Sequence, residues 1–266
     1  MSPPTKLTTH ILSLHPEAFT LATQSPFLAH AGAGTLSKNV LQKWLAQDRL
    51  YAQAYIRFAA LLLANVGLKG RVDERALEER LLDLLLSSIN NVRRELKFFE
   101  DVATRYDLDI SSPSTSSIVK DDEVQEKEGV SEGVRMYRKL FFEVGEAVES
   151  GKMGMLEGLV LLWGTEVCYL TAWRYTGSCS SSTAANPPGK EADGGALRKE
   201  FIPNWTSDEF AAFVDEIAGL VDELWEKEGE KEGTGKGRGG EERRERVEGI
   251  WKRVLDVERV FWPAVE

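Results

Sequence analysis

The sequence predicts an all-α protein, and this prediction rests on three observations. Apolar residues recur at helical spacing in one segment after another, and almost no stretch alternates like a β-strand. The chain has 266 residues, of which 42% are hydrophobic and 29% charged, as is typical of a globular protein with a substantial core. Three stretches rich in serine, glycine or charge interrupt the helices, at 111–128, 178–195 and 226–246. We therefore expect one helical domain over residues 1–266 with three flexible insertions.

Two helices are predicted near the start of the chain. A short helix spans residues 15–24 and ends before Pro26. The Ala-Gly run at 30–37 is typical of a loop, and Ser37 is a suitable N-cap for the next helix. That helix is long and is expected to end near Gly67.

Two further helices are predicted in the middle of the chain. Asp73 is expected to cap the first, whose leucines and isoleucine keep the helical period as far as Tyr106. The Ser-rich and then charged stretch at 111–128 follows as a solvated loop. Helix returns over residues 130–149.

The last third of the chain predicts three helices. The first covers residues 161–175, with the sequence LLWGTEVCYLTAWRY. Thr206 and Glu209 form a T-x-x-E capping box for a helix that continues to Trp225. The Gly-rich charged stretch after it is interpreted as a solvated linker or a frayed helix extension, and a final helix covers 247–261.

Charge and composition exclude several classes of protein. A net charge of −10 argues against a nucleic-acid partner, which would require a basic face. The most apolar run, 153–165, contains Glu157, so no membrane span and no membrane partner are expected. The N-terminus does not resemble a secretory signal, and Cys168 and Cys179 alone make no disulfide framework. We therefore expect a cytoplasmic protein.

Glu166 is the first candidate functional residue. On a helix it shares one face with Leu162, Tyr169 and Trp173. A carboxylate on such an apolar face must be paired, hydrogen-bonded or shifted in pKa, because desolvating an unpaired charge is costly. A buried structural acid and a catalytic acid both satisfy this condition, so both interpretations remain open.

Asp48 is the second candidate acid. It lies on one helical face with Tyr51 and Tyr55, at spacings of i+3 and i+7. This face therefore carries an acid beside two phenols. The alternative is a surface salt bridge between Asp48 and Arg49 or Lys43.

Glu258 and Tyr137 are weaker candidates. Glu258 precedes Phe261 and Trp262 in the sequence VLDVERVFWPAVE, which again places an acid beside aromatic rings. Taken alone, Glu258 also fits a solvated helix face, and Tyr137 also fits ordinary core packing.

Neither thiol nor metal chemistry is predicted. Cys168 follows Glu166 by two residues, so on a helix the two side chains point about 200° apart, and Cys168 is expected to be a buried, inert thiol. His10, His15 and His30 form no Glu-x-x-His pair. We expect no metal and no cofactor.

Four motifs in the chain resemble motifs of one family, the TenA (thiaminase II) family. They are the P-F-L-x-H-x-x-x-G-T-L segment at 26–36, Q-D-x-x-Y at 47–51, the FIPNWTSDEF segment at 201–210 and E-x-x-F-W at 258–262. Each motif is weak alone, but four in the right order are specific. The resemblance covers almost the whole chain outside the three insertions.

The resemblance implies a fold, a substrate and an assembly. The family fold is the heme-oxygenase-like helical bundle, with an acidic and aromatic pocket for a pyrimidine. The common branch carries P-C-Y with a catalytic cysteine, whereas WGTEVCYLTAW at 163–173 resembles the E-type branch, in which a glutamate replaces it. This branch implies hydrolysis of amino- or formylaminopyrimidine products of thiamin breakdown for salvage, rather than thiaminase activity. It also implies a homo-oligomer.

Roles for the candidate residues follow from their chemistry. Asp48 would accept a hydrogen bond from an exocyclic amine, Glu258 would protonate or bind a ring nitrogen, and Glu166 would act as general base or proton shuttle. Three carboxylates around one small pocket repel, so at least one should have a raised pKa. The aromatic residues expected to contact the pyrimidine are Phe27, Tyr51, Tyr137, Tyr169, Trp173, Trp205 and Phe261.

Two other functions remain open for this fold. One is a binding protein that holds a pyrimidine-like molecule without turnover. The other is an oxidative enzyme, for which His30 is the single candidate axial heme ligand.

Overall fold

The computed structural model describes residues 6–68, 76–111, 129–182, 185–231 and 238–265, and these ranges contain helices and no strand. The predicted all-α class is therefore confirmed for this part of the chain. In chain order the elements are α1 (Leu7–Ser13), α2 (Pro16–Thr23), α3 (Pro26–Ala33), α4 (Lys38–Ala64), α5 (Ala76–Tyr106), α6 (Glu132–Glu149), α7 (Met155–Cys179), the π-helical turn η2 (Leu197–Phe201), α8 (Ile202–Trp205), α9 (Asp208–Lys231) and α10 (Arg238–Phe261).

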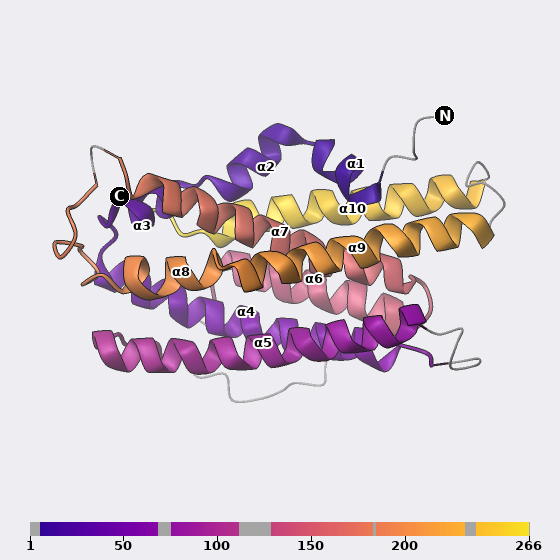
Figure 1. Cartoon of the computed structure of the whole chain (residues 1–266), viewed down its shortest axis with the longest axis horizontal. Helices are drawn as coiled ribbons and strands as arrows, with labels where there is room; N and C mark the ends of the chain where they lie inside the picture. Colours follow the sequence, from indigo (N-terminus) through magenta and orange to yellow (C-terminus); the bar gives the residue numbers. More distant parts are fainter. Residues whose placement is uncertain (1–5, 69–75, 112–128, 183–184, 232–237, 266) are drawn as a thin grey trace.

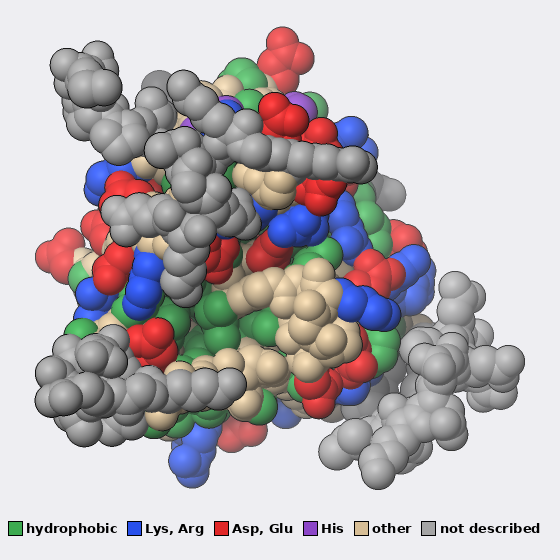
Figure 2. All heavy atoms as spheres, turned by 90° about the vertical axis from the view of Figure 1, so that its right-hand side faces the viewer, with side chains coloured by type: hydrophobic (Ala, Val, Ile, Leu, Met, Phe, Trp, Pro, Cys, Tyr) green, Lys and Arg blue, Asp and Glu red, His purple; other side chains and the backbone are tan. Residues whose placement is uncertain are grey.

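The long helices lie side by side along the length of the molecule (Figure 1). Helix α4 packs against α5 and α6, and α7 packs against α3, α9 and α10. Figure 2 views one end of this bundle, where acidic and basic side chains are interspersed around an apolar centre.

Helix α7 is the core helix of the bundle. It is long and apolar enough to span a membrane, but 78% of its most apolar window is buried inside the molecule. Its first turn buries the carboxylate of Glu157, which binds the Arg246 Nε at 2.7 Å and the Gly154 N–H at 3.0 Å. The paired charge explains how an acid is tolerated in an apolar helix.

Several predicted helix ends are confirmed. The Ser37 Oγ accepts a hydrogen bond from the Val40 N–H at 3.3 Å and caps α4 as predicted. Helix α5 runs without a break to Tyr106, and α6 begins after Ser131. The predicted cap Asp73 lies outside the described residues.

The loop predicted at 30–37 is wrong in its first half, because α3 continues to Ala33. The two glycines in this run have separate functions. A Cβ on Gly32 would lie 1.9 Å from the Thr176 carbonyl oxygen, so glycine there permits the close approach of α3 to α7. Gly34 ends the helix with a φ of 70°, in the left-handed region that glycine favours.

The capping box predicted at Thr206 is wrong by one residue. The Ser207 Oγ accepts the hydrogen bond from the Phe210 N–H at 3.2 Å, at the start of α9. The Thr206 hydroxyl instead donates to the Ile202 carbonyl at 2.7 Å and closes α8. Because Thr206 and Ser207 are adjacent and both carry a hydroxyl, the sequence alone does not show which of them caps the helix.

The insertion predicted at 226–246 is helical at both ends, where α9 continues and α10 begins, and 232–237 lie outside the described residues. Within the described part of this stretch, a charged residue of α10 contacts α9. The Arg243 side chain is 4% exposed and lies over the Trp225 ring at 4.8 Å. It also contacts Glu228 at 3.4 Å.

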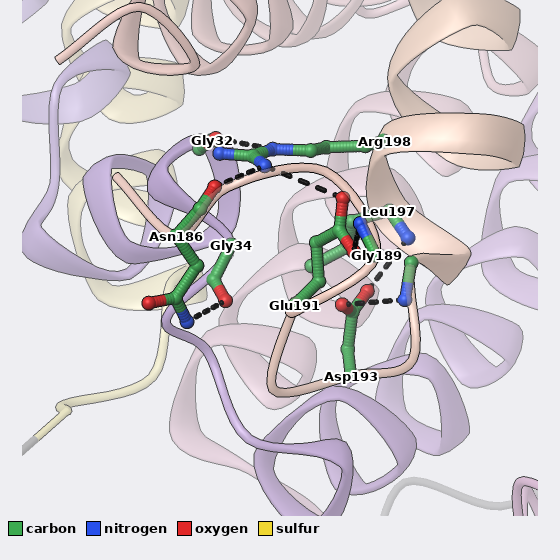
Figure 3. Close-up of polar contacts among 9 residues, drawn as sticks. Gly32, Gly34, Asn186, Gly189, Glu191, Asp193, Leu197 and Arg198 are labelled. Atoms are coloured by element: carbon green, nitrogen blue, oxygen red, sulfur yellow. Dashed lines mark hydrogen bonds and ion pairs between the residues drawn. The ribbon is translucent and has the colours of Figure 1, made fainter.

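The insertion predicted at 178–195 begins as the last turn of α7, and residues 185–195 then fold back onto α3 (Figure 3). Arg198 donates to the carbonyl oxygens of Gly32 at 3.2 Å and Asn186 at 2.6 Å, and it contacts Glu191 at 3.3 Å. The Asn186 amide donates to the Gly34 carbonyl at 2.8 Å. Polar groups of residues 185–195 therefore attach this segment to α3 and to Arg198, which composition does not reveal. In the insertion predicted at 111–128, residues 112–128 lie outside the described part of the chain.

Candidate functional site

A cavity of about 320 Å³ opens between α4, α5, α7 and the α8–α9 segment. This volume suits a small single-ring molecule. Its wall is rich in acidic and aromatic side chains, among them Asp48, Tyr51, Tyr55, Glu95, Phe98, Glu166, Tyr169 and Trp205.

Two helices supply the predicted residues on the faces that their spacing indicated. Helix α4 presents Asp48, Tyr51 and Tyr55 from one face, and α7 presents Glu166 and Tyr169. Residues more than 100 positions apart in the sequence thus meet in one cavity.

Asp48 is a buried cavity acid. Its side chain belongs to a residue that is 3% exposed, and its Oδ2 accepts a hydrogen bond from the Tyr169 hydroxyl at 3.2 Å. Burial raises the pKa of Asp48 well above its usual range, and the charge of Glu95 raises it further. The alternative of a surface salt bridge to Arg49 or Lys43 is wrong, because Asp48 is buried and forms no ion pair with either residue within the described part of the chain.

Glu166 is a half-buried acid in the cavity wall. Burial raises its pKa to about 8, and the charge of Glu95 adds to this effect. The Tyr55 hydroxyl lies near enough to lower the pKa of Glu166, although it makes no hydrogen bond of full geometry. No cation pairs with Glu166 within the described ranges, which argues against a structural ion pair.

Glu258 does not line the cavity, contrary to the prediction. It is 2% exposed, and the Tyr137 hydroxyl donates to its Oε1 at 2.6 Å. Tyr51 lines the cavity and packs against Tyr137 at 4.9 Å between ring centroids, so Glu258 lies one side chain behind the wall. Burial raises its pKa to about 8, and the charge of Glu166 contributes.

The aromatic predictions divide into two groups. Tyr51, Tyr169 and Trp205 line the cavity. The other four do not line it and are buried in the aromatic core, and these are Phe27, Tyr137, Trp173 and Phe261. Helical spacing gives the face of a residue but not its depth: Trp173 lies one turn beyond Tyr169 and packs against Trp205 at 4.2 Å.

Cys168 points away from the cavity, as predicted. It is fully buried and is not part of the cavity wall. Burial, assisted by the charge of Glu258, raises the pKa of the thiol well above its usual range. A nucleophilic thiolate requires the opposite shift.

Glu95 on α5 is a cavity acid that the sequence analysis missed. Its Oε1 accepts a hydrogen bond from the Trp205 Nε1–H at 2.5 Å, and burial raises its pKa to about 7. A signal for it exists in the sequence: Ser88, Asn91 and Glu95 recur at i, i+3 and i+7, and all three line the cavity. Because the apolar Val92 lies on the same turns as these polar residues, the pattern indicates a polar face that is buried.

The histidine considered as a heme ligand lies elsewhere. His30 is exposed, and its Nδ1 is 2.8 Å from the Thr35 hydroxyl. Among the described residues, no group of three or more His, Cys, Asp or Glu is arranged to hold a metal ion.

Comparison with known proteins identifies relatives by sequence. Residues 22–102 match the model of the TENA/THI-4/PQQC family. A Fusarium pseudograminearum (strain CS3096) protein named "Probable transcription factor" is 30% identical over 251 residues, which are 83% of this chain and 46% of that protein. The chain thus spans about half the length of this relative. An uncharacterized Schizosaccharomyces pombe protein is 24% identical over 219 residues, which are 80% of this chain and 84% of that protein.

Solved structures share the fold. A TenA homologue from Pyrococcus furiosus superposes with a TM-score of 0.67 at 22% identity, covering 96% of this chain and 97% of that one. A TenA family transcription regulator from Silicibacter sp. TM1040 gives a TM-score of 0.68 at 16% identity, with coverage of 98% and 97%. The bundle described above therefore has the helical heme-oxygenase-like fold of TenA homologues.

Proposed function

Since the chain belongs to the TENA/THI-4/PQQC family, we propose that it hydrolyses an amino- or formylaminopyrimidine derived from thiamin breakdown, for salvage of the ring. The observation that carries this proposal is the cavity itself. The acids Asp48, Glu95 and Glu166 line it together with the aromatic rings of Tyr51, Tyr169 and Trp205. This combination suits a flat, nitrogen-rich ring that offers several hydrogen-bond donors.

The ring would be held by stacking and by one acid. Tyr169 and Trp205 pack edge to face at 5.3 Å and form an aromatic corner of the cavity, against which a pyrimidine can lie. Asp48 lies beside this corner through its hydrogen bond with Tyr169. It would bind the exocyclic amine of the ring and fix the ring's orientation.

Glu166 would move the protons. With a pKa of about 8, most of it is protonated at pH 7, so it can donate a proton to the departing amine. The resulting carboxylate then takes a proton from the attacking water. For the amino substrate, the C–N bond breaks and a C–O bond forms, which yields the alcohol and ammonia. For the formylamino substrate, water adds to the formyl carbon, and formate and the amine leave.

Glu258 would contribute from behind the wall. Burial raises the pKa of Tyr51 most, the charge of Glu166 raises it further, and the charge of Glu258 adds to both effects. Tyr51 therefore remains protonated and is a hydrogen-bond donor in the cavity. We propose that Glu258 acts through Tyr51 rather than on a ring nitrogen.

The test is hydrolysis of aminopyrimidine and formylaminopyrimidine substrates, with release of ammonia or formate as the readout. Glu166→Gln keeps the shape of the side chain but cannot exchange a proton, so we expect a fall in kcat of at least about 100-fold. Glu143→Gln, an exposed acid on α6, serves as the matched control. A full rate in Glu166→Gln would overturn the assignment of Glu166.

The same experiment separates the alternative of a pyrimidine-binding protein. Such a protein would be stabilised by the ligand and release neither ammonia nor formate. Two relatives are described as a transcription factor or regulator. For this chain, a net charge of −10 disfavours contact with DNA.

A further inference from the structure

Glu95 connects two parts of the cavity wall that are far apart in sequence. It projects from the middle of α5, and its Oε1 accepts the hydrogen bond of the Trp205 indole at 2.5 Å. Trp205 ends α8, a helix of four residues, and its ring is a wall of the cavity. The bond therefore anchors a short element to a long one.

We propose that Glu95 is a positioning residue for the reaction, which holds the Trp205 ring as a cavity wall and places its carboxylate in the same cavity as those of Asp48 and Glu166. This inference rests on the proposed function for its catalytic meaning. The positioning of Trp205 and the electrostatic effect on the neighbouring acids can both be measured in the free protein without turnover.

The positioning part follows from the packing of Trp205. The ring is 2% exposed and contacts Trp173 at 4.2 Å and Tyr169 at 5.3 Å between centroids. Phe201 stacks on it at 5.0 Å as well, and these aromatic contacts pack the ring but offer its indole N–H no carboxylate or carbonyl acceptor. The hydrogen bond to Glu95 is the polar contact that fixes its orientation, because the indole N–H is its single donor.

The electrostatic part follows from the groups around Glu95. Its charge raises the pKa of Asp48, Glu166 and Tyr169. Among the residues that the structure describes, Arg94 is the basic residue of the cavity wall; its side chain is 67% exposed and donates to Glu209 at 2.9 Å, so it does not neutralise Glu95. The titratable and charged groups of the cavity wall around Glu95 are Asp48, Tyr51 and Tyr55 on α4, Arg94 on α5, Glu166 and Tyr169 on α7 and Glu209 on α9. Glu258 on α10 lies behind this wall, and its charge acts on Asp48.

Two substitutions separate the roles. Glu95→Gln retains a carbonyl oxygen that can accept the Trp205 hydrogen bond, but it removes the charge. Glu95→Ala removes both. Glu100→Gln, on the same helix with a side chain that is 53% exposed, is the matched control.

Nuclear magnetic resonance of the free protein measures both roles. The indole N–H resonance of Trp205, assigned by its loss in Trp205→Phe, should remain downfield in Glu95→Gln and move upfield in Glu95→Ala. The carboxyl carbon of Glu166 should titrate at a lower pH in both variants, because the neighbouring negative charge is gone. Glu100→Gln should change neither signal.

Each outcome has a defined meaning. An unchanged Glu166 midpoint in Glu95→Gln would overturn the electrostatic role, and an unmoved indole resonance in Glu95→Ala would overturn the positioning role. If Glu95→Ala does not fold, loss of the downfield resonance in Glu95→Gln contradicts positioning by this bond. Absence of turnover in the wild type would count against the proposed function alone. With turnover, the alkaline limb of the kcat profile should move to lower pH in Glu95→Gln.

Discussion

Burial keeps a proton on Glu166 at pH values where an exposed glutamate has lost it, and this proton has a cost in stability. The pKa of Glu166 is about 8 in the folded protein and 4.5 for a free side chain. Between these values the folded state binds more protons than the unfolded state, so rising pH favours unfolding. An acid held in this way is typical of a functional site rather than of a stabilising contact.

Glu166→Gln should therefore be more stable than the wild type at alkaline pH. The amide has no proton to lose, so it avoids the cost of a buried charge. We expect a gain of roughly 1–3 kcal/mol in the free energy of unfolding at pH 8. The gain should disappear below about pH 4.5, where both states of the wild type are protonated. Urea denaturation across this range is the measurement, and a gain that is equal at both ends of the range would contradict the linkage.

At the scale of single residues, the sequence predicted which types of side chain line the cavity, but not how far behind its wall each predicted residue lies. The spacing of Asp48, Tyr51, Glu166 and Tyr169 placed them correctly, because a helical face determines which side chains meet. Glu95 is not predicted, because the leucines of α5 alone define the helical period by which that helix is identified.

At the scale of elements, the same residue type has different meanings in different contacts. Glycine at Gly34 ends a helix, whereas at Gly32 it lets two helices touch. Only the neighbouring helix distinguishes these cases, and the neighbour is not adjacent in sequence. Helix ends marked by a single serine, such as Ser37, were predictable because their signal is local.

Gly32→Ala should separate α3 from α7. The new Cβ would lie 1.9 Å from the Thr176 carbonyl oxygen and 2.8 Å from the Cys179 Cβ, and backbone cannot yield as a flexible side chain does. We expect a loss of about 1–3 kcal/mol in the free energy of unfolding. Gly219→Ala on α9 is the control, because its Cβ would meet nothing within 4 Å. That variant should gain roughly 0.5–1 kcal/mol from helix propensity, and equal effects in the two variants would contradict the packing argument.

At the scale of the whole molecule, an aromatic core lies beside the cavity and supports its walls. Trp44 contacts Phe27 at 5.2 Å and Trp173 at 5.7 Å, while Trp205 joins this cluster to the cavity. The predicted substrate contacts at Phe27 and Trp173 thus support the site without lining it. The number of aromatic residues is evident in the sequence. Their division into a cavity wall and a layer behind it depends on the packing of six helices.

Ligand binding should therefore stabilise the entire bundle. An aminopyrimidine at about 100 times its dissociation constant should add about 2.7 kcal/mol to the free energy of unfolding. Asp48→Asn, which keeps the size of the side chain but replaces one acceptor by a donor, should reduce this gain by weakening the contact with the exocyclic amine. We expect at least a tenfold weaker dissociation constant, equal to about 1.4 kcal/mol. Thermal denaturation with and without ligand measures the effect. Asp215→Asn, at an exposed position on α9, is the matched control and should leave the ligand-induced shift unchanged. An equal shift in Asp48→Asn and wild type would mean that the ring binds without Asp48, and the cavity would then require a different orientation of its ligand.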